Sequence, residues 1–138
     1  MAKDSVRKAE YWYTTVADKP GAANDVLQKL AAAKQNLTAY LAFPMPGGKS
    51  QLDLVPADPG GFEKAAKAAG IALSPKKTAI LVQGSDRPGA LAEHMKKLAA
   101  KGVNCTAGTA IATPGGGYGF LLWVRPESVD AAAAALVG

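Results

Sequence analysis

Asp86-Arg87-Pro88-Gly89-Ala90 repeats, 68 residues later, the stretch Asp18-Lys19-Pro20-Gly21-Ala22. The similarity continues without a gap. Of the 37 residues from 18 to 54, 16 are identical to their partners at this offset. Ordinary amino-acid frequencies would leave only about two or three identities over such a length. The chain is therefore a tandem of two similar units. Two copies predict two equivalent sites, and the junction between the units is a natural place for a ligand.

The length of the chain limits how the two units are stabilised. The 138 residues divide into units of about 68 residues, which is near the lower limit for an independent hydrophobic core. We therefore expect domains at residues 1–75 and 76–138 that pack against each other or dimerise, with a homodimer as the expected assembly.

Composition places the chain among ordinary globular proteins. Hydrophobic residues make up 49% and charged residues 20%, and no apolar run approaches the ~18 residues of a membrane span. The first ten residues carry charges without a long apolar stretch after them, which argues against a signal peptide. A single cysteine, Cys105, excludes an internal disulfide and suits a reducing compartment, so a cytoplasmic location is expected.

The formal charge of +5 raises the question of nucleic-acid binding. The 16 basic residues are scattered, and their longest clusters are pairs such as Lys76-Lys77. The nine aromatic residues do not alternate with basic ones in the way that base-stacking surfaces require. A solvated basic surface is the better interpretation.

Each unit has the pattern strand, helix, strand, strand, helix. The predicted elements of the first unit are strands at 11–16, 36–43 and 50–55, helices ending near 33 and 70, and a short last strand at 71–73. Those of the second are strands at 79–84, 103–112 and 118–124, and helices ending near 101 and 138. Pro-Gly-Gly turns at 46 and 114 join the middle strands into hairpins. This order predicts an α+β fold of two ferredoxin-like βαββαβ units, with antiparallel sheets and helices on one face. The second unit lacks its last strand, which residues 1–10 or a second molecule would supply.

The Asp-x-Pro-Gly sequence before each first helix favours a helix start. A carboxylate there can accept the free N–H groups of the first turn, so Asp18 and Asp86 are interpreted as helix caps ahead of ligand contacts. The apolar residues inside these helices recur at helical spacing: Val26, Leu27 and Leu30 in the first copy, and Leu91, Met95 and Leu98 in the second. Gly102 is typical of a C-terminal cap, whereas the first copy has Lys34 at that place.

These residues resemble the ACT domain family. The resemblance rests on Asp86-Arg87-Pro88-Gly89-Ala90-Leu91, which opens a helix, followed by Gly102-Val103-Asn104-Cys105, which opens a strand. The first copy matches more loosely, with Asp18-Lys19-Pro20-Gly21-Ala22-Ala23 and Lys34-Gln35-Asn36-Leu37. It covers roughly residues 11–138, so the chain is similar to a stand-alone protein with two ACT domains.

The resemblance implies a regulatory module that binds a free amino acid between two domains. Carried over, the ligand would contact the loop Asp86–Leu91 with Asn104 and Cys105, and the equivalent loop Asp18–Ala23 with Asn36 and Leu37. Elementary chemistry agrees, because N–H groups at a helix start favour a carboxylate and glycine allows close approach to the backbone. An Asn side chain can meet both an ammonium and a carboxylate.

Several of these residues also have a purely structural interpretation. Gly21 and Gly89 could serve a tight turn as well as a ligand, and Asn36 and Asn104 could be polar residues that start strands. His94 aligns with Val26 and is predicted to be a partly buried histidine at a helix edge or subunit contact. Cys105 aligns with Leu37 and is predicted to be a small apolar residue in a strand.

The remaining motifs point away from catalysis. Pro114–Gly119 is followed by a strand pattern and lacks the Lys-Ser/Thr of a phosphate-binding loop. No nucleophile, carboxylate pair or metal-ligand spacing stands out, so we expect no enzyme activity, no cofactor and no metal. The sequence therefore predicts a non-catalytic regulatory protein that binds an amino acid. The alternative is a protein-protein interaction or oligomerisation module without its own ligand.

Overall fold

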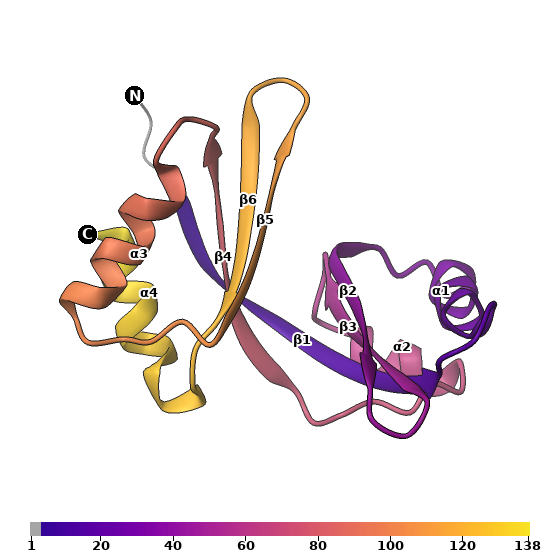
Figure 1. Ribbon diagram of the computed structural model, residues 1–138. Coiled ribbons are helices and arrows are strands. Elements are labelled where there is room, and N and C mark those ends of the chain that lie inside the picture. The colour runs from indigo at the N-terminus through magenta and orange to yellow at the C-terminus, as the bar shows by residue number, and fades with distance from the viewer. Residues whose placement is uncertain (1–3) are drawn as a thin grey trace. The chain divides into compact units, whose positions relative to one another are not determined.

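The computed structural model describes residues 4–138 as an α+β protein (Figure 1). Its strands are β1 (Ser5–Ala17), β2 (Leu37–Met45), β3 (Lys49–Pro56), β4 (Lys77–Ser85), β5 (Ala107–Thr113) and β6 (Gly117–Trp123). Its α-helices are α1 (Ala22–Ala32), α2 (Phe62–Ala68), α3 (Ala90–Ala100) and α4 (Val129–Val137), and a 3-10 turn at Pro126–Ser128 precedes α4. None of the helices within residues 4–138 is long and apolar enough to cross a bilayer.

Contacts divide the chain into two compact units, and the division falls inside β1. Glu10–Lys77 form one unit, while the residues up to Ala9 join Thr78–Gly138 in the other. The start of β1 therefore belongs with the second repeat, although the rest of that strand belongs with the first. We call these the first-repeat unit and the second-repeat unit.

The first-repeat unit is built on three neighbouring strands in the order β2-β3-β1. Both pairings are antiparallel, and Leu54 lies opposite Trp12 on one side and Tyr40 on the other. Alternate residues of β3 share one face, so Leu52 and Leu54 both join the core under α1 and α2. The Trp12 and Phe62 rings pack in that core with centroids 5.1 Å apart.

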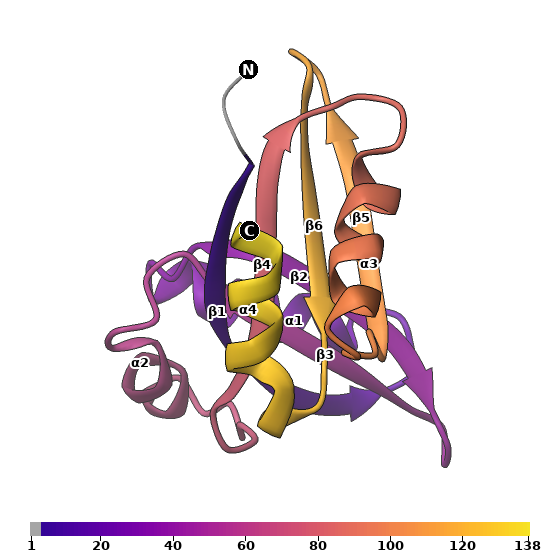
Figure 2. The same ribbon diagram turned by 90° about the vertical axis from the view of Figure 1, so that its left-hand side faces the viewer.

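The second-repeat unit has four neighbouring strands in the order β1-β4-β6-β5. Its core is formed by β4 and β6 beneath α3 and α4, which lie on one face of the sheet (Figure 2). The start of β1 occupies the place of the missing last strand: the Ser5 hydroxyl donates to the Gln83 carbonyl at 3.3 Å, and Lys8 pairs with Asp130. Of the two sources expected for this strand, the chain's own N-terminal segment is the one observed.

The predicted short strand at 71–73 is wrong. Residues 71–76 have no strand conformation, although Ser74 lies beside Tyr13 and donates its N–H to the Tyr13 carbonyl at 2.8 Å. Ile71 instead fills the core of the first-repeat unit. The strand predicted at 103–112 is also shorter than expected, because it begins only at Ala107.

The buried face of α3 differs from the predicted one. Leu91 and Met95 are 42% and 41% exposed, whereas Ala90, His94 and Leu98 are buried. The buried residues follow an i, i+4, i+8 spacing, so the helical period was correct and Leu98 was predicted, but Ala90 and His94 are buried in place of Leu91 and Met95. A histidine occupies the centre of this face, which leaves two large apolar side chains at the surface.

Helices α1 and α3 end with the same hydrogen bonds, although only one of them has the expected glycine. Gln35 N–H donates to Leu30 O at 2.9 Å, as Val103 N–H donates to Leu98 O at 3.0 Å. Lys34 must therefore adopt the left-handed conformation that Gly102 adopts, with φ of 58° against 67°. The first helix ends as cleanly as the second, at the cost of a strained lysine.

Replacing that lysine is expected to stabilise the protein. Lys34→Gly should raise the free energy of unfolding by about 1 kcal/mol, because a side chain in the left-handed region costs roughly that much. Gly102→Ala at the matched position should lower it by a similar amount. Urea denaturation of the two variants checks both signs, and a destabilised Lys34→Gly protein would contradict this assignment.

Candidate functional site

The two Asp-x-Pro-Gly loops have nearly the same backbone. Asp18 N–H donates to Gly48 O at 2.9 Å, and Asp86 N–H donates to Gly116 O at 2.8 Å. The helix N-caps are Gly21 and Gly89, with φ of 88° and 83°, which only glycine adopts readily. Neither helix has a side-chain cap, so the interpretation of Asp18 and Asp86 as caps is wrong. The N–H groups of Ala22 and Ala90 donate within the loops, to Lys19 O and Arg87 O, whereas those of the next two residues of each helix, Leu91 and Ala92 in α3, have no such bond among the described residues.

A pocket of about 430 Å³ lies beside the second loop. One wall is the loop and the start of α3, from Asp86 and Arg87 to Gly89–Ala92. The other wall is β5 at Ala110–Ala112, together with Tyr118 of β6. Leu91 and Ile111, which are 42% and 73% exposed, are among the residues of these two walls.

The predicted site residues are only partly brought together. Of the second-copy residues, Asp86, Arg87, Gly89, Ala90 and Leu91 line the pocket, whereas Pro88, Asn104 and Cys105 do not. Cys105 is half-buried against the core, and its thiol donates to Ala107 O at 3.2 Å. It precedes β5, so its placement inside a strand is wrong.

The first-copy residues are more exposed. Asp18, Lys19, Pro20 and Gly21 are exposed, while Ala22 and Ala23 are half-buried at the start of α1. Asn36 is exposed and accepts the Ala57 N–H at 2.9 Å, and Leu37 opens β2 with its side chain against the core. Leu37 therefore has a structural role in the core, whereas the bond of Asn36 is made by its backbone carbonyl and does not involve its side chain.

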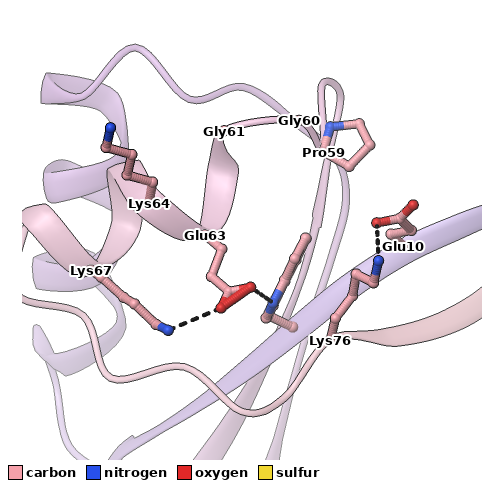
Figure 3. A pocket seen from close by; sticks show the side chains of 9 residues that line it. Glu10, Pro59, Gly60, Gly61, Glu63, Lys64, Lys67 and Lys76 are labelled. Carbon is pink, nitrogen blue, oxygen red and sulfur yellow. Dashed lines mark hydrogen bonds and ion pairs between the residues drawn. The ribbon is translucent and has the colours of Figure 1, made fainter.

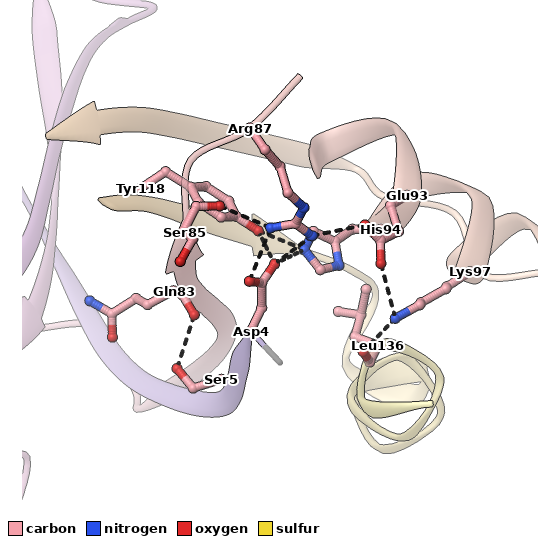
Figure 4. Close-up of polar contacts among 10 residues, drawn as sticks. All are labelled: Asp4, Ser5, Gln83, Ser85, Arg87, Glu93, His94, Lys97, Tyr118 and Leu136. Atoms are coloured by element: carbon pink, nitrogen blue, oxygen red, sulfur yellow. Dashed lines mark hydrogen bonds and ion pairs between the residues drawn. The ribbon is translucent and has the colours of Figure 1, made fainter. Parts of the chain in front are cut away.

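A buried polar cluster adjoins the pocket, and its centre is Asp4 (Figure 4). The Asp4 side chain is only 6% exposed. Arg87 donates to both of its carboxylate oxygens, at 3.2 and 3.3 Å, and Tyr118 donates its hydroxyl to the same carboxylate. Arg87 also donates to Glu93 at 2.8 Å and to Ser85 O at 2.9 Å. Arg87 and Tyr118 thus belong to both the cluster and the pocket wall.

These contacts determine the ionisation of the cluster. Burial alone would raise the pKa of Asp4, but the hydrogen bonds from Tyr118, Arg87 and His94 lower that pKa to about 2. Burial, followed by the hydrogen bond to Asp4, raises the pKa of Tyr118 to about 12. The hydrogen bonds to Glu93 and Asp4 raise the pKa of Arg87. At neutral pH the cluster therefore holds a carboxylate, a guanidinium and a neutral phenol.

His94 is the third partner of Asp4 and is fully buried, at 2% exposure. Its Nε2 lies 2.9 Å from Asp4 Oδ2 and 2.7 Å from the Tyr118 hydroxyl, while Nδ1 has no hydrogen-bond partner among the described residues. Because both neighbours of Nε2 can accept, we assign a proton to Nε2, which can donate it to Asp4. The prediction of a histidine at a helix edge or subunit contact is therefore wrong. Asp4 lies 90 positions away, so no local pattern points to this pairing.

The low pKa of Asp4 predicts a specific loss of stability in acid. The folded-state pKa of about 2 lies below the reference value of 3.8, so the unfolded state binds the proton more readily. The stabilisation is present above pH 3.8 and is lost as the pH falls towards 2. Wild type should lose about 2 kcal/mol more than Asp4→Asn between pH 5 and pH 2. Urea titrations of both proteins at these pH values measure the difference, and parallel losses would contradict the assigned pairing.

A second pocket, of about 670 Å³, lies in the first-repeat unit and is lined by Glu10, Trp12, Pro59–Gly61, Glu63, Lys64, Lys67 and Lys76 (Figure 3). Its two carboxylates are already paired, Glu63 with Lys67 at 2.9 Å and Glu10 with Lys76 at 3.3 Å. The Trp12 indole N–H also donates to Glu63, at 3.3 Å. Of the two pockets, the one beside the second loop is the better candidate for a ligand site, because it contains the repeated motif.

Within residues 4–138 no group of three or more His, Cys, Asp or Glu side chains is placed to hold a metal ion.

Comparisons with known proteins identify the fold. No family model matches the sequence, and no curated protein matches it. A structure from Bacteroides thetaiotaomicron matches with a TM-score of 0.82 and 21% identity, covering 96% of this chain and 88% of that one. The ligand-free regulatory subunit of aspartate kinase from Thermus thermophilus matches with a TM-score of 0.67 and 18% identity, covering 99% and 95%. The regulatory subunit of aspartate kinase from Thermus flavus gives 0.59 and 17%, with the same coverages. The chain therefore has the ACT-type fold that its repeated motif predicts.

Proposed function

We propose that this chain is a non-catalytic regulatory protein that binds a free amino acid in the pocket beside Asp86–Leu91. The observation that carries the proposal is the pocket itself, which joins an uncapped helix start, a free carboxylate and an apolar wall. Its volume lies within the usual range of small-molecule sites. The similarity to regulatory subunits of aspartate kinase supports a regulatory role.

The chemistry of the pocket suits a zwitterion. At the start of α3 the first N–H groups have no partner within the helix, and the helix dipole favours negative charge there. A ligand carboxylate would sit at the N–H groups of Leu91 and Ala92. Asp86 is exposed and its carboxylate has no partner among the described residues, so it can pair with an ammonium. Arg87 is already held by Asp4 and Glu93, and its charge is therefore largely neutralised.

The wall formed by β5 would receive the side chain of the amino acid. Ala110 and Ala112 lie opposite Phe120 and Tyr118 in the β5–β6 ladder, so they share the face that carries the helices. Together with Leu91 they make this part of the pocket apolar. Binding would stabilise the conformation of the regulated protein that binds the amino acid best. The ligand would thereby shift the populations of the conformations.

A thermal-shift screen against the twenty common amino acids tests the proposal. A ligand that binds only the folded state raises the melting temperature by mass action. A selective rise with one amino acid or a related group is expected, and Asp86→Asn should weaken that binding by roughly tenfold, the usual scale for one charged contact. The same measurement on Asn104→Ala tests the ligand contact that the resemblance to the ACT domain family implies for Asn104. If none of the amino acids raises the melting temperature of a folded sample, the proposal is wrong.

One observation favours the alternative of an assembly module. β5 ends the strand order, and its seven residues are all exposed, uncharged and free of proline. β2, at the other end, contains Pro44 and a register irregularity near Leu37, both of which discourage edge pairing. The edge expected from the missing strand is filled by β1, so self-pairing would use β5 instead. Light scattering of wild type and Ile111→Lys tests this, since a monomeric wild type would remove the case for it.

A further inference from the structure

The cluster around Asp4 and the proposed ligand loop share two side chains. Arg87 and Tyr118 line the pocket, and both donate hydrogen bonds to Asp4. Arg87 also donates to the Ser85 carbonyl, one residue before the loop begins. The position of the loop is therefore connected to the position of Asp4 by direct contacts.

The two copies of the loop differ at this point. Arg87 of the second copy aligns with Lys19 of the first, which is exposed and forms no ion pair within the described chain. The remaining backbone hydrogen bonds of the two loops match closely, as in Ala22 to Lys19 and Ala90 to Arg87, both at 3.3 Å. The attachment to the N-terminal segment is thus specific to the second copy and is no general requirement of the loop.

Gly84 makes room for this attachment. A Cβ at residue 84 would overlap the Asp4 carboxylate, so the N-terminal segment can dock with Asp4 in place only because residue 84 is glycine. Gly84 lies opposite Tyr118 in the β4–β6 ladder, and the hydroxyl of this tyrosine donates to Asp4. Gly119, in the same sheet, has nothing within 4 Å of the equivalent position.

We infer that Asp4 is a positioning residue for the second site: docking of the N-terminal segment holds Arg87, Tyr118 and the loop Asp86–Leu91 in the shape that accepts an amino acid. Docking and binding then stabilise each other, because thermodynamic coupling is reciprocal. Release of the N-terminal segment would lower the affinity of the pocket for the amino acid. An amino acid bound in the pocket would in turn stabilise the docked segment. The inference rests on the proposed function for the identity of the ligand, but the positioning itself does not.

Hydrogen exchange followed by mass spectrometry tests the positioning without any ligand. Asp4→Asn and Gly84→Ala should each accelerate exchange of residues 85–92 by about tenfold or more, since the loop opens more often once its anchor is lost. Residues 10–77 should keep the wild-type rates, and so should all regions of the Gly119→Ala control. Faster exchange at residues 4–9 with an unchanged loop in both variants would overturn the inference.

The effect of ligand binding on the docking of the N-terminal segment is tested with wild type and each of the twenty common L-amino acids. An amino acid that raises the melting temperature should also slow exchange at residues 4–9, which a merely structural Asp4 would not explain. It should bind Asp4→Asn roughly tenfold more weakly than wild type and bind Gly119→Ala normally. Protection confined to the pocket would overturn the coupling. If no amino acid binds wild type, the proposed function fails, and the ligand-free exchange still decides whether Asp4 positions the loop.

Discussion

Ala110→Trp is expected to abolish amino-acid binding while leaving the protein folded. Ala110 is an exposed residue in the β5 wall of the pocket, on the same face as Phe120. An indole at this position would occupy the volume that the amino acid needs, so the affinity should fall by on the order of 100-fold or more, about 3 kcal/mol. Isothermal titration with the amino acid selected by thermal shift measures the loss.

The internal repeat supplies the control for this experiment. Ala42 is the residue of the first copy that aligns with Ala110, and it is likewise exposed and opposite a core residue, Leu52. Ala42→Trp therefore adds the same bulk in the same kind of strand of the first-repeat unit. Wild-type affinity in this variant assigns the effect to the pocket. Equal losses in both variants would show that the binding site lies elsewhere.

Arg87→Leu is expected to destabilise the second-repeat unit by about 3 kcal/mol. The substitution leaves the Asp4 carboxylate buried without the guanidinium that donates to both of its oxygens, and breaking a buried ion pair from one side costs about that much. Arg87 is 25% exposed, so water offsets part of the loss. Lys19→Leu at the aligned position should change stability by no more than about 0.5 kcal/mol, because that residue is exposed. Urea denaturation with probes in each unit checks both values, and a mild effect of Arg87→Leu would mean that Asp4 is not held as described.

The repeated loop is what made the fold predictable. Each helix, hairpin and turn signal occurs twice at an offset of 68 residues, so a weak pattern in one copy is supported by the other. The split βαβ order and the ACT-type fold follow from it. The strand at 71–73 failed for a local reason: Ile71 is apolar because it fills the core, and Ser74 meets Tyr13 outside any regular ladder.

The candidate site was less predictable, because its contacts are distant in sequence or depend on the backbone. Asp4 precedes the repeats and meets His94 and Tyr118 across 90 and 114 positions, so periodicity carries no trace of it. His94 aligns with Val26, which is buried, but it was predicted to be only partly buried at a helix edge or subunit contact, and the alignment carries no sign of its polar partners. The expected Asp caps failed because a left-handed glycine occupies each N-cap, which leaves the second and third N–H groups of each helix without a side-chain cap.

Chemical-shift mapping shows whether an amino acid binds beside the second loop, and a chain of 14.1 kDa is suited to this measurement. Amide spectra of the labelled protein would be recorded with the twenty amino acids, first in pools and then singly. We expect saturable shifts for one amino acid or a related group, concentrated at residues 86–92, 110–112 and 118 and extending to residues 4–9. Shifts centred on the first loop, or no shifts with any amino acid, would contradict this expectation.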